Sequence, residues 1–219
     1  AGPASEEIGE TLRDRIKVDR WKRQVRLLQK VNENLKQAGV DPQPVRPRLL
    51  LSITDSASVE DDDFLHDAWA ALLANAADPK VRRNVKPYYV EILKQLSDDQ
   101  AKLLSGLYDA VTKDPLREFR NISLGNVGDL WEAYKTANGD TIEFDGGDDF
   151  EIALENLERL GLIGPSPDHA SQIDPPEISV SDIESATEDS DSQPELFEYS
   201  LTNLAYHFVS ACRRFERPR

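Results

Sequence analysis

Two short acidic clusters contain the side chains best suited to metal chemistry in this sequence. The first is residues 60–63, four consecutive carboxylates, and the second is the segment FDGGDDFE at residues 144–151. Neighbouring residues of a helix point in different directions, so four consecutive carboxylates cannot converge on one ion. The second segment lacks the alternating carboxylates of a calcium-binding loop. We interpret both as helix starts, where carboxylates face the positive end of the helix dipole, and expect no metal site and no cofactor.

The histidines and the cysteine form no recognisable catalytic or zinc-binding arrangement. His66, His169 and His207 lack close His/Cys/Asp spacing, and His66 and His207 fall within helical patterns, which favours structural or surface roles. Cys212, the single cysteine, lies on the apolar face of a predicted helix and is expected to be a buried thiol in a reducing cytoplasm. Phosphate-binding, nucleophile-elbow and metalloprotease motifs are absent from the sequence. We predict that the protein is not an enzyme and has no catalytic residue.

Two clusters of basic residues are the candidate contacts for an anion or a protein partner. One lies on a face of a predicted N-terminal helix, and the other lies in a loop between two predicted helices. Their members are Arg13, Arg20, Arg23 and Arg26 on the helix, where Arg15 and Lys22 share the face, and Lys80, Arg82, Arg83 and Lys86 in the loop. A plain solvated surface is the favoured interpretation of both clusters. For the helix face the alternatives are a seat for the acidic remainder of the chain or a partner protein, and contact with phosphate or lipid.

The charge of the chain is unevenly distributed. The net charge is -15, yet residues 1–50 have 11 Lys and Arg against 7 Asp and Glu, whereas residues 51–219 have 15 against 34. A chain this acidic repels nucleic acid at long range, so a nucleic-acid partner is disfavoured. The expected partner is therefore another protein, and a homo-oligomer is a further candidate.

Apolar residues at helical spacing predict a helical region over residues 1–96. It begins with one long helix at residues 5–38, which Gly39 ends, followed by a stiff proline-rich connector at residues 41–47. The buried stripe expected on the long helix is Ile8, Leu12, Ile16, Trp21, Val25, Leu28, Val31 and Leu35.

Four shorter helices are expected after the connector, and the first is a short buried helix through Leu49, Leu50 and Ile53. Ser58 with Asp61 is interpreted as a capping box for the helix around Trp69, which ends at Pro79. Pro87 opens the next helix, and a second capping box at residues 97–100 opens the one that follows. Buried side chains are expected at Leu49, Leu50, Ile53, Phe64, Leu65, Ala68, Trp69, Leu72, Leu73, Ala76, Tyr89, Ile92, Leu93 and Leu96.

Four segments give the chain a family resemblance. They are GPASEEIGETLRDRIKVDRWKRQVRLLQK, WAALLANAADP, PYYVEILKQLSDDQAKLL and LTNLAYHFVSAC, which frame nearly the whole chain. In these segments the chain resembles the Abi-alpha (abortive infection alpha) family of bacterial proteins. The resemblance implies a role in defence against phage, with a phage or host protein as the partner, but supplies no motif with a known catalytic or binding duty. It also implies an apolar segment upstream of Ala1, and membrane contact is expected only through that segment.

The second predicted domain, residues 97–219, has the element order of a winged helix: a helix-turn-helix core and a small two-stranded wing. The predicted wing pairs residues 162–163 with residues 196–199, and the acidic insertion at residues 171–195 is expected to be disordered. The helix in the recognition position, DDFEIALENLERL, has Arg159 as its one basic residue, and residues 160–212 contain neither Lys nor Arg. This composition opposes DNA binding, which depends on neutralising phosphates.

The fold class predicted from the sequence is therefore mainly α, with an N-terminal helical region and a winged-helix-like α+β domain. The function expected is non-enzymatic, cytoplasmic anti-phage defence of the abortive-infection type, acting through protein contacts. A winged-helix transcriptional regulator or adaptor is the alternative, and an unrecognised hydrolase or nuclease is the third.

Overall fold

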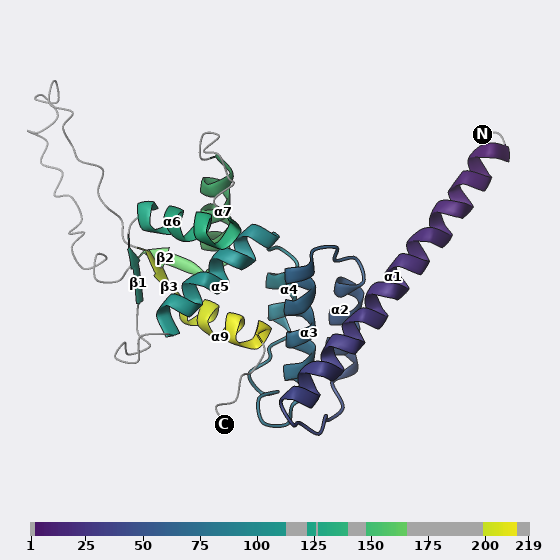
Figure 1. Ribbon diagram of the computed structural model, residues 1–219, viewed down its shortest axis with the longest axis horizontal. Coiled ribbons are helices and arrows are strands. Elements are labelled where there is room, and N and C mark those ends of the chain that lie inside the picture. Colours follow the sequence, from purple (N-terminus) through teal and green to yellow (C-terminus); the bar gives the residue numbers. More distant parts are fainter. Residues whose placement is uncertain (1–2, 113–121, 126, 140–147, 166–198, 214–219) are drawn as a thin grey trace, which may run out of the picture. The chain divides into compact units, whose positions relative to one another are not determined.

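The computed structural model describes residues 3–112, 122–125, 127–139, 148–165 and 199–213 (Figure 1). These residues form eight helices and three strands, which confirms the mainly helical fold class. They divide into two compact units, unit 1 with Ala1–Ala101 and His207–Arg219, and unit 2 with Lys102–Tyr206. The division falls within α5 (Asp98–Thr112) and α9 (Asn203–Cys212), whereas the sequence analysis placed one boundary after residue 96.

Unit 1 begins with α1 (Pro3–Gln37), the long helix that the apolar spacing predicted. Gly39 follows it with a φ of +60°, a left-handed conformation that glycine adopts without strain. The second half of α1 packs on α2 (Pro47–Ala57) and α3 (Asp63–Ala77), and the first half extends beyond them (Figure 1). The buried residues of this packing face are Leu27, Val31 and Leu35.

The buried stripe predicted for α1 is wrong in part. Its members Leu12, Ile16, Trp21 and Leu28 are half exposed or more. Leu27, which the prediction omitted, is fully buried in place of its neighbour Leu28. The reason is that consecutive helical residues point about 100° apart, so only one of two adjacent leucines can face α2 and α3.

The connector leads into α2, with a proline in its first turn. Ile53 and Ala57 are its buried residues. The capping box predicted from Ser58 and Asp61 is wrong, because Ser58 still caps the end of α2. Asp62 is instead the N-cap of α3, and its side chain accepts a hydrogen bond of 2.8 Å from the amide of Leu65.

The central helix α3 is buried on almost every side. Between residues 65 and 77 only Asp67 is exposed, so the one-sided buried face predicted from the sequence was too narrow. Six of its fifteen residues are alanine, and small side chains let neighbouring backbones approach closely. The helix ends at Asp78, before Pro79, as predicted.

The last turns of α9 complete unit 1 together with α4 (Tyr88–Leu93). Tyr89 of α4 meets Phe208 edge to face, with ring centroids 5.6 Å apart. The side-chain amide of Asn75 in α3 donates to the carbonyl oxygen of Ala211 at 2.9 Å. These contacts join residues more than one hundred positions apart in the sequence, which is why the end of the chain belongs to unit 1.

The sheet of unit 2 has three short antiparallel strands in the order β1-β3-β2. β2 (Ile163–Pro165) pairs antiparallel with β3 (Tyr199–Leu201), whereas the sequence had predicted a pair of residues 162–163 with residues 196–199. β1 (Ile122–Gly125) pairs with the other edge of β3, so Leu201 is aligned with both Ile122 and Ile163. Residues 196–198 and the predicted disordered insertion at residues 171–195 lie outside the described residues.

Helices α6 (Val127–Asn138) and α7 (Asp148–Arg159) complete unit 2. Phe150 of α7 packs against Trp131 and Tyr134 of α6, with ring centroids 5.0 Å and 5.3 Å away. After α7, Gly161 turns the chain into β2 with a φ of +69°. Thr202 then caps α9 as predicted, because its hydroxyl accepts a hydrogen bond of 3.1 Å from the amide of Ala205.

Candidate interaction surface

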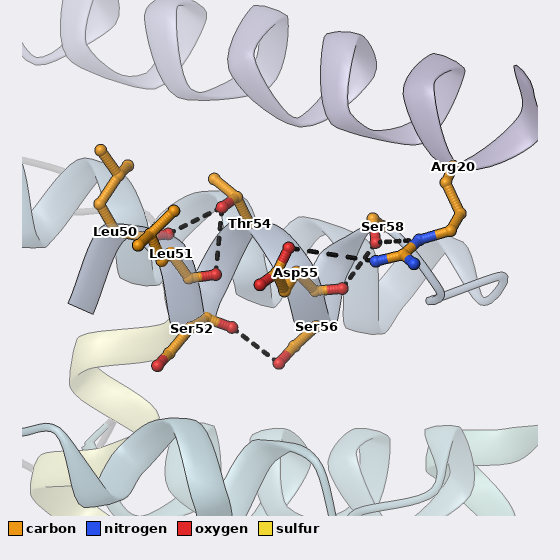
Figure 2. Close-up of polar contacts among 8 residues, drawn as sticks. All are labelled: Arg20, Leu50, Leu51, Ser52, Thr54, Asp55, Ser56 and Ser58. Atoms are coloured by element: carbon orange, nitrogen blue, oxygen red, sulfur yellow. Dashed lines mark hydrogen bonds and ion pairs between the residues drawn. The ribbon is translucent and has the colours of Figure 1, made fainter. Parts of the chain in front are cut away.

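Arg20, one of the predicted contact residues, faces its own unit. Figure 2 shows its side chain reaching from α1 to the end of α2, where the guanidinium lies between Ser58 and Asp55. Its Nε donates to Ser58 Oγ at 3.0 Å, and its Nη2 lies 4.0 Å from Asp55 Oδ1. Because Ser58 is fully buried, this contact gives its hydroxyl oxygen a charged donor.

Two further cations of α1 pair with carboxylates of α3. Arg26 forms an ion pair with Asp63, and Lys30 forms one with Asp67. Lys30 is one helical turn after Arg26 in α1, and Asp67 is one helical turn after Asp63 in α3. The matching direction of the two steps shows that α1 and α3 run parallel here. The hydrogen bond and the positive charge of Arg26 hold the pKa of Asp63 below its ordinary value. This part of the basic face is therefore a seat for acidic residues of the same chain, the second of the three interpretations given above.

The other predicted contact residues remain at the surface. Arg13 is exposed and Arg23 is half-buried on α1. In the loop between α3 and α4, Lys80, Arg82, Arg83 and Lys86 are all exposed. The Nζ of Lys86 donates to the carbonyl oxygen of Arg83 at 2.9 Å, and Asp78 Oδ1 accepts from the amide of Lys80 at 2.8 Å. The eight predicted residues thus do not converge on one site, although the four loop residues lie together.

The hydroxyl groups of α2 bind their own helix. Thr54 donates to the carbonyl oxygens of Leu50 and Leu51, and Ser56 donates to that of Ser52 at 2.8 Å (Figure 2). Ser58 donates to Asp55 in the same way, at 2.6 Å. Hydroxyls that donate to backbone carbonyls are structural groups rather than activated nucleophiles.

His66 is a buried residue of α3 with a backbone partner. Its Nε2 lies 3.3 Å from the carbonyl oxygen of Arg23, and its Nδ1 is buried without a hydrogen-bond partner. Burial lowers the pKa of His66 below 6.5, and the nearby cations Lys30 and Arg26 lower it further. The backbone contact and Asp67 oppose this shift. A neutral imidazole whose Nε2 donates to Arg23 satisfies this geometry.

The cysteine and one buried tyrosine are poor nucleophiles. Burial raises the pKa of the Cys212 thiol far above its ordinary value, although the residue as a whole keeps some exposed surface. Burial likewise raises the pKa of Tyr89 to about 12, and the adjacent Tyr88 contributes. Both groups therefore keep their protons at neutral pH, and the thiolate needed for covalent catalysis is disfavoured.

Within the part of the chain that the structure describes, no three His, Cys, Asp or Glu side chains are grouped closely enough to hold a metal ion. None of the described helices combines the length and the apolar character that a membrane span requires.

The surface feature that the sequence analysis missed is the outer face of α1. Val18, Trp21 and Leu28 are 49%, 64% and 54% exposed, and Val25 between them is half-buried. Their spacing of three, four and three residues is typical of a heptad seam, and Leu27, Val31 and Leu35 recur every four residues. Spacing alone does not separate the two sets, because Leu35 follows Leu28 by seven residues. The predicted stripe had mixed the two sets.

The comparisons with known proteins assign the chain to a family. The sequence pattern of the family described as Abortive infection alpha matches residues 20–212, which is most of the chain. The protein therefore belongs to the Abortive infection alpha family, as the resemblance indicated. Neither the curated proteins nor the solved structures include a match to this chain.

Proposed function

We propose that this protein is a non-enzymatic member of an abortive-infection-type defence against phage, and that it acts in the cytoplasm through contacts with phage or host proteins. The match to the Abortive infection alpha family over residues 20–212 carries the defence role. The contact role has separate support, because large apolar side chains on α1 are exposed to solvent.

The state of the reactive side chains supports the non-enzymatic part of the proposal. The thiol of Cys212 is held protonated by burial, and His66 is placed to donate to a backbone carbonyl. The serine and threonine hydroxyls of α2 donate to carbonyl oxygens of their own helix. The histidine and the hydroxyls therefore have structural contacts that account for their positions, and the thiol is held in its unreactive form.

Unit 2 is proposed to be a winged-helix module that meets protein rather than DNA. The order α5, β1, α6, α7, β2, β3 and the sheet order β1-β3-β2 support the winged-helix assignment. On α7, the helix in the recognition position, Asp149, Glu151, Glu155 and Glu158 are exposed. Arg159 donates to Asn156 Oδ1 at 2.7 Å. Carboxylates on this helix would repel DNA phosphates, which disfavours the transcriptional regulator.

A phage challenge of bacteria expressing the protein tests the defence role. We expect plaque numbers to fall at least about tenfold for one or more phages of a diverse panel, relative to cells with an empty vector. Trp69→Asp is the control that should remove protection, because it puts a charge into the core of unit 1. A panel in which no phage is restricted would contradict the defence role.

A second variant separates binding from catalysis. Cys212→Ser should protect as well as the wild type, because the proposal gives the thiol no chemical step. Equal amounts of folded protein, checked by immunoblot and circular dichroism, make the comparison valid. Loss of protection by a folded Cys212→Ser protein would favour an enzyme instead.

A further inference from the structure

The outer face of α1 carries a narrow apolar seam, defined here as Val18, Trp21, Val25 and Leu28. These residues are separated by three, four and three positions, the spacing of alternate a and d positions in a heptad. The seam extends for about 15 Å along the helix, from its first to its last residue. Three of its four side chains are about half exposed or more, so it is a free surface of unit 1.

The seam is separate from the face that α1 uses inside unit 1. That inner face has Leu27, Val31 and Leu35 buried against α2 and α3. At about 100° per residue, the centre of the seam lies about 100–140° around the helix from Leu27 and Val31 and about 60° from Leu35. Leu35 follows Leu28 by seven residues and is buried, so the exposed seam ends at Leu28. A partner could therefore cover the seam without displacing α2 or α3.

The width of the seam indicates the kind of partner that fits. Its four residues occupy about 80° of the helix circumference, the width of an a/d seam. A helix that lies in a membrane interface presents a wider apolar face, and here basic and polar residues begin directly beside the seam. The geometry therefore favours a second helix over a lipid surface.

The charges beside the seam indicate the chemistry of that helix. Arg15 and Lys22 lie on one side and Lys17 on the other, in the e and g positions that meet a partner's charges. Lys17 lies 3.3 Å from Asp14, and Lys22 lies 3.5 Å from Asp19, but these exposed pairs within one helix are weak. A second copy of α1 would place cations against cations in either orientation, whereas an acidic helix would complement them.

We propose that the seam of α1 docks an amphipathic helix of another protein, with apolar residues in a and d positions and Asp or Glu in the flanking e and g positions. This inference deepens the proposed function and rests on it, because it specifies the class of partner through which the protein acts. The basic side chains guide the approach and set the register, and Trp21 supplies the largest apolar contact.

The direct test uses a synthetic peptide of about three heptads, with Leu at a and d and Glu at e and g. Its labelled form is titrated with the purified full chain, and binding is followed by fluorescence anisotropy. We expect saturable binding that weakens as salt is raised from about 50 to 500 mM, because screening shortens the reach of the charges. A peptide of the same composition with Lys at e and g should bind at least about tenfold more weakly.

Variants of α1 show where the peptide binds. Trp21→Ala with Leu28→Ala should weaken binding at least about tenfold, through loss of apolar contact. Leu12→Ala with Ile16→Ala is the matched control, because these residues are also exposed and apolar but lie on another face, and it should change binding less than about twofold. Arg15→Glu with Lys22→Glu should reverse the preference between the Glu and Lys peptides.

Several results would overturn the proposal. They are failure to bind the Glu peptide, equal binding of the Lys peptide, and equal loss in the Leu12 and Ile16 variant. Two further results would assign the seam to another occupant: binding to phosphatidylglycerol vesicles in place of the peptide, or self-association that the Trp21 and Leu28 variant abolishes. Peptide binding is measured without phage, so a failed phage challenge would remove the defence role and leave this result intact.

Discussion

Single polar residues set the ends and contacts of the helices in unit 1. Asp62 caps α3, Ser58 joins α2 to Arg20, and Asn75 binds the backbone of α9. A proline or a positive-φ glycine acts on its neighbours along the chain, so the ends of α1 and α3 could be predicted from the sequence. The choice between Ser58 and Asp62 as the cap could not, because it depends on how far α2 extends and on Arg20, 38 positions away.

Asp62→Ala tests the cap that the structure assigns. We expect a loss of about 0.5–2 kcal/mol in the free energy of unfolding, because the amide of Leu65 loses its acceptor at the start of α3. Urea denaturation followed by circular dichroism gives the value. Asp61→Ala is the matched control, since Asp61 is exposed and precedes the cap, and it should change stability by less than about 0.5 kcal/mol. A larger effect at Asp61 would restore the capping box predicted from the sequence.

The buried His66 predicts a pH dependence of stability. Its pKa in the folded state is below 6.5, so the unfolded state binds the proton more readily. Stability is therefore complete above pH 6.5 and falls as the pH drops through that value, by at most about 1.4 kcal/mol per pH unit from this group.

His66→Gln provides the comparison, because glutamine keeps a donor for the carbonyl oxygen of Arg23 but does not titrate. Urea denaturation of both proteins at pH 7.5 and pH 5.5 isolates the histidine, since the carboxylates are common to both. The wild type should lose more stability than the variant over this interval. Equal losses would show that His66 is not desolvated in the folded state.

At the level of the element, α1 shows what sequence periodicity can and cannot determine. Its existence and length follow from thirty-odd residues with helical spacing and from Gly39. Its rotation about its own axis does not, because apolar residues occur on two faces and Leu27 and Leu28 are adjacent. Burial by α2 and α3 selects the Leu27 face, and that tertiary choice leaves the seam exposed.

The two adjacent leucines test the orientation of α1. Leu27→Ala should lower the free energy of unfolding by about 2–5 kcal/mol, because it removes a fully buried side chain and leaves a cavity. Leu28→Ala should change it by less than about 0.5 kcal/mol, because that side chain is 54% exposed. Both variants have the same chemical change and nearly the same helix propensity effect. A reversed order of stabilities would mean that α1 packs through the face predicted from the sequence.

For the whole molecule, the distribution of charge could be predicted from the sequence more completely than the contacts between distant segments could. The excess of carboxylates after residue 50 can be counted in the sequence, and it already disfavours DNA binding. The structure adds that Glu151, Glu155 and Glu158 are exposed on α7. The return of the chain end to unit 1 could not be foreseen, because it depends on contacts such as Tyr89 with Phe208. Which face of α1 stays exposed likewise depends on its packing, so the seam could not be predicted from the sequence.

The acidic face of α7 leads to a prediction about the whole protein and DNA. With a net charge of -15 and exposed carboxylates on the would-be recognition helix, the wild type should show no salt-dependent binding to a labelled random duplex at about 50 mM salt. The variant Glu151→Lys with Glu155→Lys and Glu158→Lys replaces three carboxylates by cations and should gain weak binding that salt abolishes. Electrophoretic mobility and fluorescence anisotropy measure both proteins, and the variant shows that the assay can detect binding through this face. Salt-dependent binding by the wild type would contradict the protein-contact role of unit 2 and favour a transcriptional regulator.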